Sequence, residues 1–108
     1  MNLQKAVQLA ERVHGKQLRQ ITGEPFMNHL HRVAEGCSGQ SEMIIAYLHD
    51  VLEEDQNYCI MSLKQEGFTD DILHDISLLT RNGESYLSYI KNVKSSVRAT
   101  RVKIADLR

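Results

Sequence analysis

One imidazole and four carboxylates gather at the end of a strongly apolar stretch, residues 41–55. Its first part, Met43–Leu48, is apolar at every position, so we expect a central helix in the middle of the fold. Backbone carbonyls already make the end of a helix negative, and each acid there costs about 0.3–1 kcal/mol unless a cation lies nearby. Imidazole nitrogen and carboxylate oxygen are ligands that divalent metals accept. The clustered residues are His49, Asp50, Glu53, Glu54 and Asp55.

Two interpretations of this acidic end stay open on charge alone. In the first, the acids are solvated residues of an ordinary helix end and turn. In the second they belong to a cation site, because the pairs His49–Glu53 and Asp50–Glu54 are each four residues apart and stack on adjacent helix faces. A metal needs further ligands from elsewhere, and periodicity does not rank them. The candidates are His14, His29, His31, His74, Asp75 and Asp106.

The elements that must position these side chains are all predicted to be helices. Helical periodicity and the Gly and Pro breaks predict helices over residues 2–14, 25–35, 41–55, 61–66, 70–80, 84–93 and 97–107. Ser41 and Thr69 are suitable N-caps. Near one face of the last helix lie Val97, Thr100, Ile104 and Leu107. Because no segment alternates as a strand does, the predicted fold is all-α, with about six or seven helices.

Length and composition restrict the class of protein. The 108 residues, 42% of them hydrophobic and 25% charged, suit a single compact domain over residues 1–108. No apolar run approaches the roughly 20 residues of a membrane helix, and the N-terminus lacks the apolar region of a signal peptide. Cys37 and Cys59 have no metal-finger spacing, so reduced thiols are expected. We therefore expect a cytoplasmic protein with no membrane partner.

The charge is unevenly distributed along the chain. The net charge of −1 argues against a nucleic-acid partner. Residues 1–80 hold six Lys and Arg against twelve Asp and Glu, whereas residues 81–108 hold seven against two. The basic end is either a solvated helix face or one side of a site for a phosphate-bearing ligand, with the acidic cluster on the other side.

Four motifs in order make the pattern specific. They are HGKQLRQITGEPFMNHLHRVA at 14–34, AYLHDVLEE at 46–54, LTRNGESYLSYI at 79–90 and VKIADLR at 102–108. Together they resemble the HD-domain phosphohydrolases. Within these they are similar to the (p)ppGpp 3′-pyrophosphohydrolase group, the hydrolase module of RelA/SpoT proteins and its small single-domain relatives. The resemblance implies a compact HD-domain helical bundle.

The resemblance also implies a metal site. Four family ligands hold one divalent metal, typically Mn²⁺, and they match His29, His49, Asp50 and Asp106. The acidic pair that orients and activates the attacking water matches Glu53 and Glu54. The family has Asp at the second position, and the extra methylene of Glu54 moves the carboxylate by an amount that can lower the rate about 100-fold.

Substrate contacts follow from the same comparison. Arg19 matches a cation of the GQ-x-R loop that packs on guanine or reaches phosphates, and Lys103 and Arg101 are further phosphate candidates. Leu30 stands where the family often has proline. His31 lies on roughly the opposite helix face from His29 and is interpreted as structural.

The implied function is metal-dependent hydrolysis of the 3′-pyrophosphate of ppGpp or pppGpp. The alarmone synthetase half of bifunctional relatives does not fit in 108 residues. The chain stops two residues after Asp106, so we expect it to lack the C-terminal helices of the family, and together with Glu54 this favours as an alternative a catalytically impaired nucleotide-binding module. A third hypothesis is an HD hydrolase of another nucleotide, such as a nucleoside monophosphate. A monomer and a homo-oligomer both stay open.

Overall fold

The fold is a bundle of helices, as predicted. The computed structural model describes residues 2–55, 57–81 and 83–107, and in them it has eight helices and one isolated antiparallel bridge, Leu18 with Pro25. The helices are α1 (Asn2–His14), α2 (Phe26–Glu35), α3 (Gln40–Leu48), α4 (Val51–Glu54), α5 (Ile60–Gln65), α6 (Asp70–Leu79), α7 (Tyr86–Lys94) and α8 (Val97–Asp106). If α3 and α4 are counted as one interrupted helix, the described residues hold seven helices, the upper number predicted. None of the helices in the described ranges has the length and apolar content needed to cross a membrane.

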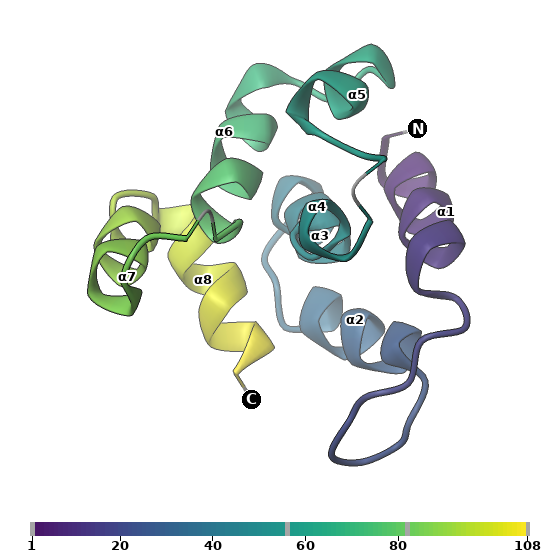
Figure 1. Cartoon of the computed structure of the whole chain (residues 1–108). Coiled ribbons are helices and arrows are strands. Elements are labelled where there is room, and N and C mark those ends of the chain that lie inside the picture. Colours follow the sequence, from purple (N-terminus) through teal and green to yellow (C-terminus); the bar gives the residue numbers. More distant parts are fainter. Residues whose placement is uncertain (1, 56, 82, 108) are drawn as a thin grey trace.

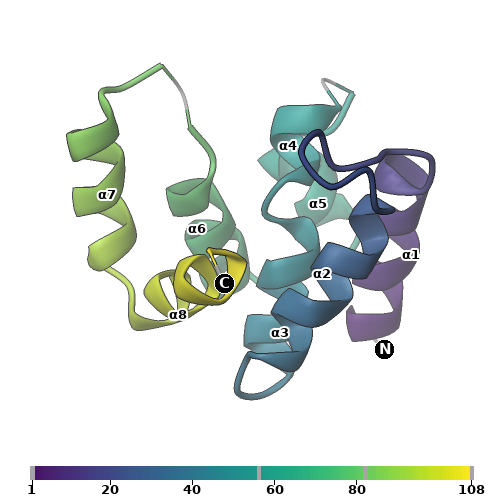
Figure 2. The same ribbon diagram turned by 90° about the horizontal axis from the view of Figure 1, so that it is seen from below.

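Helix α3 is the centre of the bundle. It contacts α1 and α2 on one side and α6 and α8 on the other, and Figure 1 shows it nearly end-on inside the ring of other helices. Seen from below, α6, α7 and α8 form one side of the molecule and α1 and α2 the other (Figure 2). Ile45, Ala46 and Leu48 are fully buried. The long apolar run therefore supplies the middle of the core, as its composition predicts.

The start of the central helix differs from the prediction. Ser41 is not its N-cap, because the helix already begins at Gln40, after Gly39 in the left-handed region with φ +89°. No side chain caps the start of α3, but the carboxylate of Glu42 bonds the residue before the N-cap. It is buried and accepts a hydrogen bond of 3.1 Å from the backbone N–H of Ser38. This bond ties the first turn of α3 to the chain that precedes it.

The end of the central helix also differs from the prediction. A single helix over residues 41–55 was wrong, since α3 ends at Leu48 and a turn at His49 and Asp50 separates it from α4. The ring of His49 bonds the carbonyl oxygen of Ala46, one turn back, at 2.7 Å. Such a local side-chain bond competes with regular helix geometry. The interruption falls on His49 and Asp50, two of the predicted metal ligands.

A buried carboxylate joins α6 to the start of α8. Asp75 is 3% exposed, accepts a hydrogen bond of 2.6 Å from the Ser96 hydroxyl and pairs with the Arg98 guanidinium at 2.8 Å. Ser96 is also the N-cap of α8 and accepts from the Ala99 N–H. A buried charge needs such partners. Asp75 therefore positions α8, and its partners are Ser96 and Arg98 rather than the other candidate metal ligands.

The apolar residues predicted near one face of the last helix are not its buried residues. Val97, Ile104 and Leu107 are 67%, 49% and 69% exposed, whereas Ala99 and Val102 are fully buried. The side of α8 that carries Ala99 and Val102 therefore packs inward, toward α3 and α6. Asp106 lies one turn after Val102 and therefore on the inward side.

A matched pair of valines on α8 tests this orientation. Val102→Ala removes two buried carbons and is expected to lower the free energy of unfolding by about 2 kcal/mol. Val97→Ala is the same change on the solvent side and is expected to stay within about 0.5 kcal/mol of wild type. Urea unfolding of both variants measures the difference, and equal losses would contradict the orientation of α8.

Candidate metal centre

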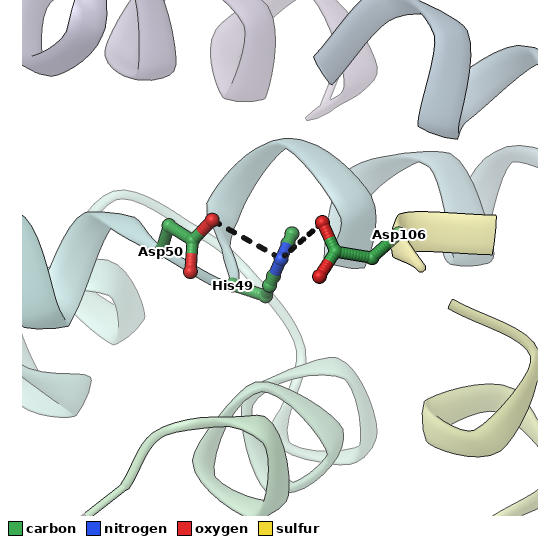
Figure 3. A group of neighbouring side chains, drawn as sticks. All are labelled: His49, Asp50 and Asp106. Atoms are coloured by element: carbon green, nitrogen blue, oxygen red, sulfur yellow. Dashed lines mark ion pairs between the residues drawn. The ribbon is translucent and has the colours of Figure 1, made fainter. Parts of the chain in front are cut away.

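Three predicted ligands meet at one place in the structure. His49 and Asp50 follow the last residue of α3, and Asp106 ends α8 (Figure 3). The His49 Nε2 atom lies 3.2 Å from Asp50 Oδ2 and 3.6 Å from Asp106 Oδ1. One ligand atom of each residue lies within 4.8 Å of the others. A single cation can contact all three at this spacing.

The orientation of His49 suits a metal ligand. The residue is 3% exposed, and its Nδ1 lies 2.7 Å from the carbonyl oxygen of Ala46. A carbonyl only accepts, so Nδ1 carries a proton and Nε2 points to the carboxylates. Nε2 is buried and has no hydrogen-bond partner among the described residues. A metal-bound histidine has the same arrangement, with its second nitrogen held by a backbone carbonyl.

The electrostatics of the cluster favour a positive charge at this nitrogen. Burial lowers the pKa of His49, but the carboxylates of Asp50 and Asp106 outweigh it and raise the pKa to about 9. Burial raises the pKa of Asp106, yet the nearby His49 imidazole and the contact with His29 hold it well below its usual range. Either a proton or a metal ion can supply the charge that these acids require.

The fourth predicted ligand reaches the cluster through Asp106. His29, on α2, is buried, and its Nε2 lies 2.8 Å from Asp106 Oδ1. The ring of Phe26 packs edge-on against His29 with centroids 5.6 Å apart. Asp106 therefore lies between two imidazoles that come from α2 and from the end of α3. All four residues named by the motif comparison lie together.

Of the remaining histidine candidates, two have other partners and one is exposed. His31 bonds the Tyr47 hydroxyl at 2.7 Å through Nδ1, in agreement with its structural interpretation. His14 is fully buried and bonds the side chain of Gln17 at 2.7 Å. His74 is exposed on α6. Sequence periodicity did not separate these histidines from the ligands, because all of them lie on helices or at helix ends.

The two acids of α4 differ in their contacts. Glu53 is exposed, and its Oε1 accepts a hydrogen bond of 2.7 Å from the backbone N–H of Arg81, in the segment between α6 and α7. Glu54 is also exposed, and its own N–H bonds the carbonyl of Asp50 at 3.0 Å. Asp55 accepts from the Asn57 N–H and acts as a loop residue, as predicted.

Lys103 and Tyr89 lie beside the cluster. Lys103 Nζ is 3.7 Å from Asp106 Oδ2 and 5.6 Å from the centre of the Tyr89 ring. Burial, opposed by the charge of Lys103, raises the pKa of Tyr89. The carboxylates of Glu53 and Asp50 raise it further. Sequence reasoning missed Tyr89 as a site residue because its tyrosine-rich segment has the pattern of an ordinary helix face.

The loop between α1 and α2 holds Arg19 by a salt bridge. Arg19 lies 3.4 Å from the carboxylate of Glu24, which also accepts two bonds from the Arg32 guanidinium, at 2.9 and 2.5 Å. The Arg19 N–H donates to the carbonyl of Glu24, and the Gly23 N–H donates to the carbonyl of Arg19, which closes the loop. The loop lines a hollow of about 290 Å³. Arg101, the other phosphate candidate, instead pairs with buried Glu42 at 3.1 Å.

A scan against protein-family models finds no match, and no curated protein is similar to the chain. The case for a family therefore rests on the four motifs and on the residues that meet at the cluster.

The ion pairs of Glu24 predict an acid-sensitive loop. The hydrogen bond from Arg32 lowers the pKa of Glu24 from 4.5 to about 2. A lowered pKa stabilises the fold above pH 4.5, and this contribution is lost as the pH falls toward about 2. Wild type should lose more thermal stability over that interval than Glu24→Gln. Glu11→Gln, at an exposed glutamate of α1, is the control and should behave as wild type; parallel curves for all three would contradict the prediction.

Proposed function

We propose that this chain is a metal-dependent phosphohydrolase of the HD-domain type, acting on a phosphorylated nucleotide. The observation that carries the proposal is the position of His49 Nε2 between Asp50 and Asp106, at the junction of α3, α4 and α8. The four motifs favour the 3′-pyrophosphate of ppGpp or pppGpp as the bond that is hydrolysed.

The ligand set fits a divalent first-row metal such as Mn²⁺. It combines imidazole nitrogen with carboxylate oxygen, and the buried His49 Nε2 lacks a hydrogen-bond partner among the described residues. His49, Asp50 and Asp106 would hold the ion, with His29 as the fourth ligand. A bound divalent metal lowers the pKa of a coordinated water and stabilises charge on a phosphoryl oxygen.

The chain supplies the groups that move the proton and hold the reactants. Glu53 and Glu54 follow the ligands by one helical turn and are exposed carboxylates, suited to accept the proton of the attacking water. The bond from the Arg81 N–H fixes Glu53 through Oε1. Lys103 pairs with the Oδ2 atom of Asp106, whereas the two histidines face its Oδ1 atom. Lys103 thus brings a positive charge to the cluster for an anionic substrate.

Recognition of the nucleotide base is assigned to the loop between α1 and α2. Arg19 is held by Glu24 at the lining of the hollow in this loop, together with the ring of Phe26. A guanidinium and an aromatic ring can both stack on a base. The guanosine part of the proposal comes from the resemblance of this segment, whereas the metal-dependent hydrolysis comes from the cluster.

Metal binding is the first expected outcome. Mn²⁺ at about 100 times its Kd should stabilise the fold by about 2.7 kcal/mol, measured as a rise in the thermal midpoint that EDTA reverses. Asp50→Asn removes a ligand charge and should abolish the response. Asp70→Asn makes the same change at an exposed position in the first turn of α6 and should respond as wild type. A metal response that survives Asp50→Asn would contradict the assigned ligands.

Turnover is the second expected outcome. With Mn²⁺, wild type should release pyrophosphate from ppGpp, and Asp106→Asn should lower the rate by about 100-fold or more, because it removes a ligand that two histidines orient. Asp70→Asn is again the control.

A substrate panel measured in the same way separates the rival functions. Calorimetric binding of ppGpp without product would show a nucleotide-binding module in place of a hydrolase. Metal-dependent hydrolysis confined to a nucleoside monophosphate would keep the HD chemistry and overturn the alarmone substrate.

A further inference from the structure

The acidic character of the cluster creates a problem for any phosphorylated substrate. Asp50, Asp106, Glu53 and Glu54 place four carboxylates at the ends of α3, α4 and α8. A phosphate group is repelled by this charge, and a single divalent ion compensates only part of it. Lys103 is one cation beside the cluster. The inference developed here rests on the proposed function and concerns a second cation that the motif comparison does not assign.

Arg81 is that second cation. Its guanidinium carbon lies 5.4 Å from the centre of the Tyr89 ring, and Lys103 Nζ lies 5.6 Å from the same ring centre. Tyr89 is 4% exposed, and its hydroxyl donates to the carbonyl of Leu79 at 3.1 Å, so the ring is a fixed support. Cation–π attraction holds both charges next to it. Residues from the start of the α6–α7 segment and from α8 are thus brought to one aromatic ring.

The two parts of Arg81 have different roles. Its backbone N–H donates to Glu53 Oε1 at 2.7 Å, which places the residue directly beside a carboxylate assigned to water activation. Its side chain is exposed and also lies over Tyr86, with 5.7 Å from the guanidinium carbon to the ring centre. Nη2 donates to the carbonyl of Glu84 at 3.3 Å. A guanidinium has five N–H donors, so further donors can bind a ligand.

We propose that Arg81 and Lys103, both held against Tyr89, form an anion site for the pyrophosphate group of the substrate at the edge of the metal cluster. The planar guanidinium binds two phosphate oxygens at once, and the lysine adds a point charge on the Asp106 side. The competing interpretation is that Arg81 only ties the α6–α7 segment to Glu53 and the tyrosines. The two differ in the consequence of removing the side chain, because every variant at this position other than proline keeps the N–H that holds Glu53.

Calorimetric titration of the 108-residue chain with inorganic pyrophosphate, without metal and with Mn²⁺, tests the proposal. Loss of one charge-assisted contact predicts about tenfold weaker binding for Arg81→Ala. Arg81→Lys keeps the positive charge but loses the planar guanidinium that can contact two oxygens at once, so its affinity for pyrophosphate should lie between those of Arg81→Ala and wild type. Lys94→Ala removes an exposed cation from the last turn of α7 and should bind as wild type. Thermal unfolding of each variant checks that it is folded. If Arg81→Ala does not fold, the binding measured for Arg81→Lys tests the proposal instead.

The outcomes separate this site from the proposed hydrolase activity. Unchanged pyrophosphate binding by both Arg81 variants, equal weakening by Lys94→Ala, or no binding by wild type overturns the anion site. Arg81-dependent pyrophosphate binding in a protein that does not hydrolyse ppGpp supports the anion site and overturns only the hydrolase. Hydrolysis that continues at a wild-type KM in Arg81→Ala overturns the anion site and leaves the hydrolase in place.

Discussion

The burial of the His49 imidazole between carboxylates is the interaction on which the rest of the site depends. The residue follows the most buried helix of the bundle, where a polar ring without partners would be strongly unfavourable. The Ala46 carbonyl satisfies one nitrogen, and Asp50 and Asp106 face the other. Because Asp106 lies at the end of α8, its contact with His49 forms only when α8 packs against α3.

The placement of α8 connects this requirement to the core. Asp75 holds the first turn of the helix through Ser96 and Arg98, and the buried Ala99 and Val102 set its rotation. Asp106 then reaches His49 and His29 from the last turn. A carboxylate on α6 thus determines where a carboxylate on α8 lies, although the two share no contact in the cluster.

Positive and negative groups are separated around one aromatic ring. The acids are concentrated at the ends of α3, α4 and α8, while Arg81 and Lys103 lie against Tyr89. The backbone bond from Arg81 to Glu53 keeps the two sets adjacent. Under the proposed function, the cations would attract the anionic substrate and the acids would hold the metal ion, so the two tasks would fall to neighbouring but distinct side chains.

Much of this protein could be predicted from the sequence alone, because helix periodicity, glycine breaks and caps are local. Apart from the interrupted central helix, the helices begin and end within about two residues of their predicted bounds, and the motif order selected the four residues that meet at the cluster. Tertiary structure decided what depends on how helices cross. It determined the break after Leu48, the inward side of α8, the role of Asp75 and the position of Tyr89. The physical reason is that a side-chain pair such as His49–Asp106 joins residues far apart in the chain, and no local pattern records which helix faces will meet.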